Sequence, residues 1–413
     1  MKIAIIGAGV TGLISLKYAL EQGFECDSFE QTGLIGGTWN YTDRVGTDEN
    51  GLPVHSAMYK GLRTNLPKET MAFLDFPYPE QVKSYLTQPE VLDYFNCFAD
   101  CFNLRRHIKF YKYVTKVKPL PNSRWAVTVQ DAKTKVEETK TYDSVFVCSG
   151  HYRDAMVPKI PGQDIFKGSQ SHSHDYRIPE PFKDKRVLVI GAGPSGQDIS
   201  MLISKAAKHV FISHRGKKIY IPITENITEK PIVKYLEENR AVFEDGTSED
   251  IDMILYCTGY KYTYPFLTEE CGIKVHDNWV HPLHKDIVNI EHPTMYFIGI
   301  PFMISVIPMF DIQARYALAA LAGKFTLPSK EDMLNILREY MDDRKKRGVP
   351  LKETHNMGAE GEKQLQYFDD LAATAGVRRI PTVVSKLYGE VKTRRNLEAG
   401  FKILDDENFI QIA

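Results

Sequence analysis

MKIAIIGAGVTG, residues 1–12, decides the fold class of this 413-residue chain. Residues 2–6 have the apolar, β-branched character of a buried strand, and apolar residues at helical spacing follow from Leu13. Between them, Gly7 permits a tight turn, Gly9 lets the backbone approach a pyrophosphate, and Gly12 allows the helix to pack closely on the sheet. The stretch predicts a Rossmann-type strand, turn and helix.

The strand that follows this loop ends in a residue that can bind a ribose. Residues 25–30 form a second strand that ends in Glu30, about 20 residues past the loop, where a carboxylate can accept from two ribose hydroxyls. A glycine-rich packing turn is the alternative. The residues expected to bind the first dinucleotide are Gly7, Gly9, Val10, Thr11, Gly12 and Glu30.

The same pattern returns at residues 186–215 with a different ending. Its strand and glycine loop are followed by a helix, but the next strand ends in Ser213-His214-Arg215. A carboxylate there would repel a 2′-phosphate, whereas Arg215, helped by Ser213, would bind one and so favour NADPH over NADH. The alternative is that Arg215 is merely a surface residue. The expected contacts are Gly191, Gly193, Pro194, Ser195, Gly196, Gln197, Asp198, Ser213 and Arg215.

Composition supports a two-domain globular protein that acts on small molecules. Apolar residues make up 43% of the chain, and 52 basic against 53 acidic residues leave a formal charge of -1. No net field would draw this chain to nucleic acid or an anionic membrane, and no apolar run approaches the roughly 18–20 residues of a spanning helix. The first residues do not resemble a signal peptide. We expect a soluble protein that is cytoplasmic, or secreted if a signal peptide has been removed. The sequence does not decide whether the chain forms a homo-oligomer.

The cysteines narrow the redox chemistry. The six are Cys26, Cys97, Cys101, Cys148, Cys257 and Cys271, with no Cys-x-x-Cys pair, so we expect neither a disulfide framework nor a metal site. Cys97 and Cys101, one helical turn apart, are expected in the core. Two dinucleotide sites imply hydride transfer from a nicotinamide to a flavin. Without a close dithiol to accept electrons from the flavin, oxygen becomes the favoured acceptor.

The domain boundaries follow from breaks on either side of the second glycine-loop unit. Prolines 158, 161, 179 and 181 mark an irregular crossing, and a second crossing is expected near Gly259-Tyr260. We expect an α/β fold with two Rossmann-like domains, the NADPH domain (154–261) inserted in a discontinuous FAD domain (1–153 and 262–413). Alternation at 124–129, returning through Val136, predicts an antiparallel hairpin. A helix capped by Ser329 is expected to bury Met333, Ile336, Leu337 and Tyr340.

Residues 166–176 resemble a fingerprint of the flavin-containing monooxygenases. The family pattern F-x-G-x-x-x-H-x-x-x-Y is matched by Phe166, Gly168, His172 and Tyr176. Related Baeyer-Villiger enzymes usually carry Trp, followed by Pro or Asp, where this chain has Tyr176-Arg177, which disfavours ketone oxygenation. We expect the fingerprint to link domains and assign it no proton transfer.

Other segments extend this resemblance over most of the chain. Gly36-Gly37-Thr38-Trp39 is similar to a family loop that lies along the flavin, and Thr64-Asn65 to a segment whose Asn faces the flavin and NADP. Residues 252–260 resemble the A-T-G-Y hinge, with Cys257 in place of Ala. Residues 308–313 resemble P-x-x-E-x-Q, which carries over Gln313 and leaves Asp311, in place of Glu, in doubt. The resemblance thus adds Gly37, Thr38, Trp39, Thr64, Asn65 and Gln313 to the cofactor-binding residues.

The resemblance implies a mechanism and a substrate type. NADPH reduces FAD, oxygen forms a flavin C4a-hydroperoxide, and a soft nitrogen or sulfur nucleophile is oxygenated. Asn65, the one catalytic residue carried over, would position NADP and the peroxide; the alternative is that it caps a local turn. The chain looks like the compact soluble members, such as insect N-oxygenases that detoxify pyrrolizidine alkaloids by N-oxide formation. The competing interpretations are a flavin oxidase or reductase that releases hydrogen peroxide, a Baeyer-Villiger enzyme, and a nucleotide-sensing scaffold.

Overall fold

The computed structural model describes residues 1–79, 83–216, 219–221, 223–394 and 398–412, which form two compact units. Unit 1 comprises Met1–Asn40, Arg63–His151 and Tyr262–Ala413, and unit 2 comprises Tyr41–Leu62 and Tyr152–Lys261. The chain passes from unit 1 to unit 2 after His151 and returns at Tyr262, where the predicted domain boundaries follow residues 153 and 261. The boundaries differ from the prediction at Tyr41–Leu62, which had been assigned to the first domain.

Unit 1 is built on a seven-stranded mixed sheet. Its strands are, in order, β20 (Leu283–His284), β21 (Val288–Asn289), β22 (Met295–Phe297), β7 (Ser144–Val147), β1 (Lys2–Ile6), β2 (Glu25–Phe29) and β3 (Ile108–Lys109). The strands from β22 to β3 run parallel, while β20 and β21 add an antiparallel edge. Since β1 is buried on both faces, its sequence reads as a continuous apolar run rather than an alternating one.

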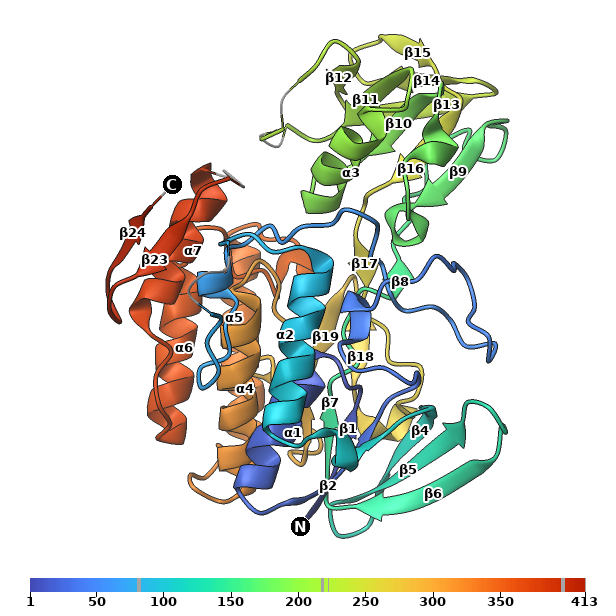
Figure 1. Ribbon diagram of the computed structural model, residues 1–413. Coiled ribbons are helices and arrows are strands. Elements are labelled where there is room, and N and C mark those ends of the chain that lie inside the picture. The colour runs from blue at the N-terminus through green and yellow to red at the C-terminus, as the bar shows by residue number, and fades with distance from the viewer. Residues whose placement is uncertain (80–82, 217–218, 222, 395–397, 413) are drawn as a thin grey trace. The chain divides into compact units, whose positions relative to one another are not determined.

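The helices of unit 1 lie beside this sheet (Figure 1). They are α1 (Val10–Glu21), α2 (Gln88–Cys101), α4 (Val306–Leu321), α5 (Lys330–Lys346), α6 (Glu362–Ala375) and α7 (Thr382–Arg394). Helix α4 packs between α1 and α6, and every residue from Ile307 to Ala319 is buried. Ser329 caps α5 as expected, accepting a hydrogen bond from Asp332 N, but the expected apolar face is wrong beyond Met333: Ile336 is 48% exposed.

Three smaller sheets complete unit 1. The predicted hairpin is present as β5 (Arg124–Asp131) and β6 (Glu137–Tyr142), and β4 (Lys112–Leu120) extends it to three antiparallel strands. Two short hairpins pair β18 (Lys274–His276) with β19 (Trp279–His281), and β23 (Phe401–Ile403) with β24 (Phe409–Gln411).

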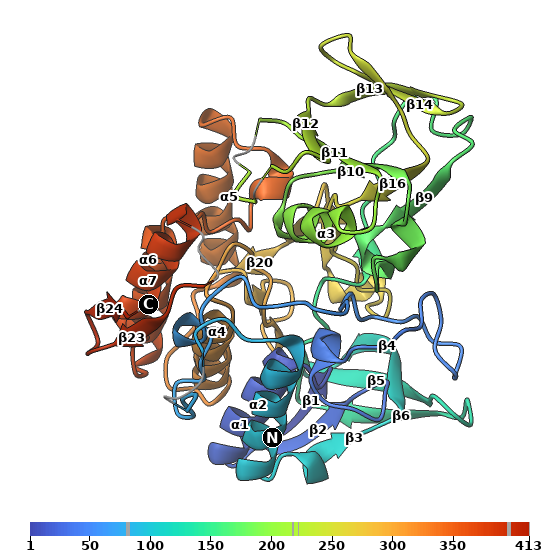
Figure 2. The same cartoon turned by 45° about the horizontal axis from the view of Figure 1, so that its top comes forward.

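Unit 2 repeats the parallel α/β arrangement. Its five-stranded sheet has the order β12 (Ile227–Lys230), β11 (His209–Ser213), β10 (Arg186–Ile190), β16 (Met253–Tyr256) and β9 (Ser169–His172). Helix α3 (Pro194–Ser204) packs on β10 and β11, as Figure 2 shows. The sheet is joined by β13 (Val233–Glu237), β14 (Arg240–Phe243) and β15 (Ser248–Asp250), and by the pair β8 (Asp154–Ala155) and β17 (Tyr260–Lys261).

Arg177 explains why Tyr41–Leu62 belongs to unit 2. Its side chain is 6% exposed and donates to five backbone carbonyls, three of them in that segment: Thr42, Arg44, Ser56, His174 and Tyr176. Its own carbonyl accepts from Lys60 N at 2.9 Å. A guanidinium offers five N–H donors in a fixed fork, so one buried side chain can hold a long irregular segment in place.

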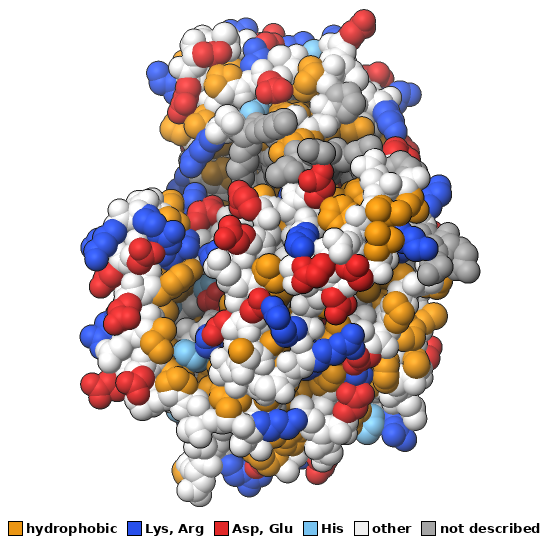
Figure 3. All heavy atoms as spheres, turned by 90° about the vertical axis from the view of Figure 1, so that its left-hand side faces the viewer, with side chains coloured by type: hydrophobic (Ala, Val, Ile, Leu, Met, Phe, Trp, Pro, Cys, Tyr) orange, Lys and Arg blue, Asp and Glu red, His pale blue; other side chains and the backbone are white. Residues whose placement is uncertain are grey.

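The expected core position of Cys97 and Cys101 is wrong, because both are exposed. The buried face of α2 is Val91, Tyr94, Phe95, Phe98 and Ala99, which leaves the two thiols on an outer face. In the part of the chain that the structure describes, no helix has the length and hydropathy to cross a bilayer. Basic and acidic side chains are interspersed on the face in Figure 3, in line with the formal charge of -1.

Candidate nucleotide-binding sites

The first glycine loop leaves its helix open to a ligand. Gly7 has φ +104°, and a Cβ there would lie 2.6 Å from the carbonyl oxygen of Cys148; at Gly12 it would lie 2.0 Å from that of Gly7. At Gly9 an added Cβ would meet only Gly37, at ordinary contact distances. Helix α1 begins at Val10 without a side-chain cap, so its first N–H groups are available to an anion. The Thr11 hydroxyl instead donates to Cys148 O at 3.1 Å.

Glu30 is fixed at the end of β2. The residue is 4% exposed, and its carboxylate accepts from Ala8 N at 3.1 Å and from the Thr32 backbone and hydroxyl, both at 2.9 Å. The bond to Ala8 attaches the carboxylate directly to the glycine loop. The open space at Gly9, the uncapped helix and the adjacent carboxylate fit the pyrophosphate and ribose of a dinucleotide.

Residues Gly37–Trp39 form a short 3-10 helix against this loop. Gly36 N donates to Ala8 O at 2.9 Å, and a Cβ on Gly37 would lie 3.0 Å from Gly9 Cα. The Trp39 ring packs edge-on against Phe95, with centroids 6.2 Å apart. The segment recognised by resemblance thus lies beside the glycine loop, and Thr38 at its centre is half-buried.

Hydrogen bonds of the preceding residue hold the backbone at Asn65 in place. The preceding residue, Thr64, is 3% exposed; its backbone N–H donates to Leu86 O at 2.8 Å, and its hydroxyl accepts from Leu86 N at 3.0 Å. Leu66 is buried on the other side. Among the described residues the half-buried Asn65 side chain has no hydrogen-bond partner, which does not support a local capping role. Thr64 is a structural support, and Asn65 is the group left available.

Gln313 acts through the backbone of Gly299. Its side chain is fully buried: Oε1 accepts from Gly299 N at 2.9 Å, and Nε2 donates to the Tyr367 hydroxyl at 2.8 Å. A Cβ on Gly299 would lie 3.1 Å from Thr11 Cγ2. Both ends of the amide are thus bonded to protein, so we assign Gln313 to positioning Gly299 beside the first loop rather than to direct contact with a flavin.

His151, which sequence reasoning missed, holds the same glycine. Burial lowers the pKa of His151 to about 4, while a hydrogen bond with the Gly299 backbone opposes this effect and nearby His355 adds to it. A neutral imidazole four residues after β7 therefore helps to fix Gly299. No pattern used in the sequence analysis pointed to His151.

Replacing Gln313 with Leu should lower the free energy of unfolding by about 1–3 kcal/mol, because the Gly299 N–H loses its buried partner. Chemical denaturation of the FAD-free protein would measure this loss. The matched control is Gln366→Leu on the exposed face of α6, with an expected change within about 0.5 kcal/mol. Equal stability of the two variants would contradict the positioning role.

Asp311, left in doubt by the sequence, is an internal structural acid. It is 1% exposed, pairs with Arg315 at 2.6 Å and accepts from the Tyr18 hydroxyl at 2.7 Å. Burial raises its pKa, and the Arg315 charge opposes that shift. The carboxylate joins α4 to α1 and does not face the first loop.

The second loop repeats the geometry of the first in unit 2. Gly191 has φ +106° and no room for a Cβ, which would lie 2.5 Å from Cys257 O; at Gly196 a Cβ would lie 1.9 Å from Gly191 O. Around Gly193, by contrast, there is open space, and α3 begins at Pro194 without a side-chain cap. Ser195 lies half-buried in this first turn. The arrangement fits a second pyrophosphate.

The polar residues around this loop have different roles. Gln197 donates to Ala192 O at 2.9 Å and accepts from Tyr220 N at 2.8 Å, and Asp198 accepts from the Tyr59 hydroxyl. Ser213 is 2% exposed and donates to Pro231 O at 2.8 Å, so its hydroxyl proton is not available to a phosphate. The expected help from Ser213 is therefore withdrawn. Arg215 is exposed and makes no ion pair within the described residues.

The fingerprint residues are packed inside unit 2. Phe166 and Tyr176 lie in two of its hydrophobic clusters, and a Cβ on Gly168 would lie 2.3 Å from Asp252 O. His172 ends β9 and accepts from His174 N at 3.0 Å. Their common effect is to fix β9 against β16 and to bring the chain to Arg177.

Two uncapped Rossmann loops are typical of an oxidoreductase that binds two dinucleotides; one lies beside a carboxylate, and the other beside Arg215, which has no ion pair among the described residues. Comparisons with known proteins specify the class further. The family model described as flavin-binding monooxygenase-like matches residues 1–222 and 217–393. The chain is 38% identical to senecionine N-oxygenase of Tyria jacobaeae over 395 residues, covering 94% of this chain and 85% of the relative.

Solved structures agree with this match. S-allyl-L-cysteine S-oxygenase from Allium sativum aligns with a TM-score of 0.89 at 35% identity, covering 95% of this chain and 92% of that one. Tmm from Pelagibacter sp. strain HTCC7211 aligns with a TM-score of 0.85 at 27% identity over 95% and 90%. The chain belongs to the flavin-binding monooxygenase-like family. It is an NADPH-dependent flavin-containing monooxygenase, with FAD and NADPH as cofactors.

Proposed function

We propose that this enzyme uses NADPH and O2 to oxygenate a soft nitrogen or sulfur nucleophile, with tertiary-amine plant alkaloids, such as pyrrolizidine alkaloids, as the first substrate class to test. In this proposal unit 1 binds FAD, and unit 2, made of Tyr41–Leu62 and Tyr152–Lys261, binds NADPH. The observation that carries the proposal is the available Asn65 amide on a segment of unit 1 pinned by Thr64. It places a neutral polar group in the unit that holds the Glu30 loop.

The relatives support both kinds of nucleophile. One is named for N-oxygenation of senecionine and another for S-oxygenation of S-allyl-L-cysteine. The 38% identity to the N-oxygenase over nearly the whole chain favours nitrogen. Few substrate-specific residues are required, because the flavin, when bound and reduced by NADPH, would supply activated oxygen to any soft nucleophile admitted.

In this proposal the protein's own residues bind the two cofactors and orient the reacting groups. Glu30 holds the ribose of FAD, the open loops at Gly9 and Gly193 receive the two pyrophosphates, and Arg215 selects the 2′-phosphate. Asn65 orients the reacting groups by hydrogen bonds without offering an acidic proton, because an amide stays neutral at every accessible pH. Excluding proton donors matters since stray protonation would release hydrogen peroxide instead of product.

Asn65→Asp tests this role. The replacement keeps the shape but puts a titratable carboxyl in place of the amide, so the long-lived species formed when reduced enzyme meets oxygen should decay about tenfold faster, with matching peroxide release. Stopped-flow absorbance and a peroxide assay measure both effects. Asn122→Asp, in the exposed turn between β4 and β5, is the control and should leave the lifetime unchanged. An unchanged lifetime in Asn65→Asp would remove the residue from the active site.

The wild-type enzyme separates the competing functions. A panel of tertiary amines, sulfides and ketones should give NADPH consumption matched by N-oxide or sulfoxide. Immediate return to oxidised flavin with stoichiometric peroxide, whatever the substrate, would identify an oxidase instead. A lactone or ester from a ketone would identify a Baeyer-Villiger enzyme.

A further inference from the structure

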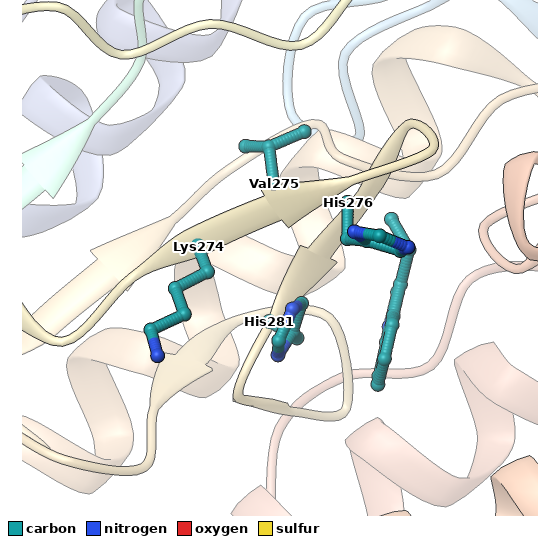
Figure 4. A pocket seen from close by; sticks show the side chains of 5 residues that line it. Lys274, Val275, His276 and His281 are labelled. Carbon is teal, nitrogen blue, oxygen red and sulfur yellow. The ribbon is translucent and has the colours of Figure 1, made fainter.

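The hairpin of β18 and β19 presents four polar or aromatic side chains on one face. Lys274 lies directly opposite His281, and His276 opposite Trp279. Because side chains two apart on a strand share a face, all four lie on the same side. Val280 has the opposite orientation and is fully buried in the core. Figure 4 shows the same arrangement, with Val275 directed away from Lys274 and His281.

An open cavity of about 610 Å³ borders the hairpin on both sides of β18, because its lining includes Val275 as well as Lys274, His276, Trp279 and His281. Pockets for small organic ligands span about 300–1,000 Å³, so the volume suits one such molecule. No residue of the hairpin belongs to either nucleotide site described above.

The charges on this face are unbalanced. Neither Lys274 nor His276 nor His281 has a carboxylate partner within the part of the chain that the structure describes. Basic groups directly opposite each other in an antiparallel pair destabilise it, whereas opposite charges stabilise it. Burial lowers the pKa of His281, and its neighbours Lys274, His276 and His355 add to this effect, which favours the neutral form of the imidazole. An anion bound on this face would therefore pair with Lys274 and could accept a hydrogen bond from the neutral His281 ring.

The aromatic groups add a flat surface. The Trp279 and His281 rings are stacked, with centroids 4.1 Å apart and planes at 15°. Trp279 is only half-buried, so part of its indole faces the cavity. Aromatic rings stack on such a surface with a gain of about 0.5–1.5 kcal/mol beyond the buried area.

We propose that the β18–β19 hairpin binds a small aromatic anion, with Lys274 and the two histidines holding the anionic group and Trp279 packing against the ring. The ligand needs two parts. An anionic group is needed to pair with Lys274, and a planar ring is needed to cover the Trp279 indole.

The test uses holoenzyme saturated with FAD and NADP, so that neither nucleotide site can take the probe. Benzoate is titrated by calorimetry at neutral pH. Benzamide, of the same shape but neutral, should bind at least about tenfold more weakly. Lys274→Ala and Trp279→Leu should each weaken benzoate binding about tenfold. The control Lys402→Ala removes an exposed lysine from the short hairpin β23–β24 and should change nothing.

A second variant separates binding from hairpin stability. Lys274→Glu places an acid opposite His281, so it should abolish benzoate binding while leaving the melting temperature equal or higher. The proposal is overturned if benzoate and benzamide bind alike, if Lys274→Ala behaves as Lys402→Ala does, or if no heat is seen up to about 10 mM benzoate.

Discussion

Alanine at Gly12 should yield an enzyme that cannot retain FAD and unfolds at a lower denaturant concentration even without the cofactor. The new Cβ would lie 2.0 Å from the carbonyl oxygen of Gly7, a backbone atom in a turn that is itself confined by Cys148. Overpacking against backbone typically costs about 1–3 kcal/mol and here should reach the upper end. Flavin absorbance of the purified protein and denaturation of the FAD-free protein would measure the two effects.

Gly9→Ala is the matched comparison within the same loop. Its Cβ would meet only Gly37, at 3.6 Å or more, so the FAD-free protein should keep its stability. The methyl group would nevertheless occupy the side from which a pyrophosphate approaches, and FAD affinity should fall about tenfold or more. If Gly12→Ala retained stability and flavin, or if Gly9→Ala bound FAD normally, the loop would not have the two roles assigned here.

Both loops could be predicted because the residues that determine their conformation lie close together in the sequence. A Gly-x-Gly-x-x-Gly spacing depends on contacts within one strand, turn and helix, and the same spacing produced nearly the same φ at Gly7 and Gly191. The role of Glu30 could also be predicted from the sequence, because this residue ends the strand that follows the first loop. The parallel strands beside these loops appeared where apolar runs were expected.

Roles that depend on distant partners could not be read in the same way. Ser213 looked like a phosphate ligand until the structure placed Pro231 O within 2.8 Å of its hydroxyl. Gln313 bonds to Gly299 and Tyr367, which are 14 and 54 residues away. The position of Tyr41–Leu62 depends on the buried Arg177, more than a hundred residues later. A side chain's type predicts what it can bond, but only the fold decides which partner reaches it first.

Replacing Arg215 with alanine should reduce the preference for NADPH over NADH by about 10- to 100-fold. A charge-assisted hydrogen bond contributes about 1.5–3 kcal/mol, and about 1.4 kcal/mol corresponds to a factor of ten. Arg215 lies two residues past the end of β11, is exposed and makes no ion pair among the described residues, so we expect its charge to be available to a 2′-phosphate. The measurement is the ratio of kcat/KM for the two nucleotides, taken from anaerobic flavin reduction.

Two controls show whether the loss is specific to Arg215. Lys205→Ala removes an exposed cation at the far end of α3, and Ser213→Ala removes the hydroxyl bonded to Pro231; both should keep the ratio within about twofold. Efficiency with NADH should change little in any of the three variants, because NADH has no phosphate at that position. A uniform loss with both nucleotides in Arg215→Ala would indicate damage to the unit rather than lost recognition, and an unchanged ratio would assign the 2′-phosphate to another residue. If the ratio falls as expected, specificity at this site would rest on Arg215, which makes no ion pair among the described residues, while Gln197 and Ser213 are bonded within the protein and hold the loop in shape.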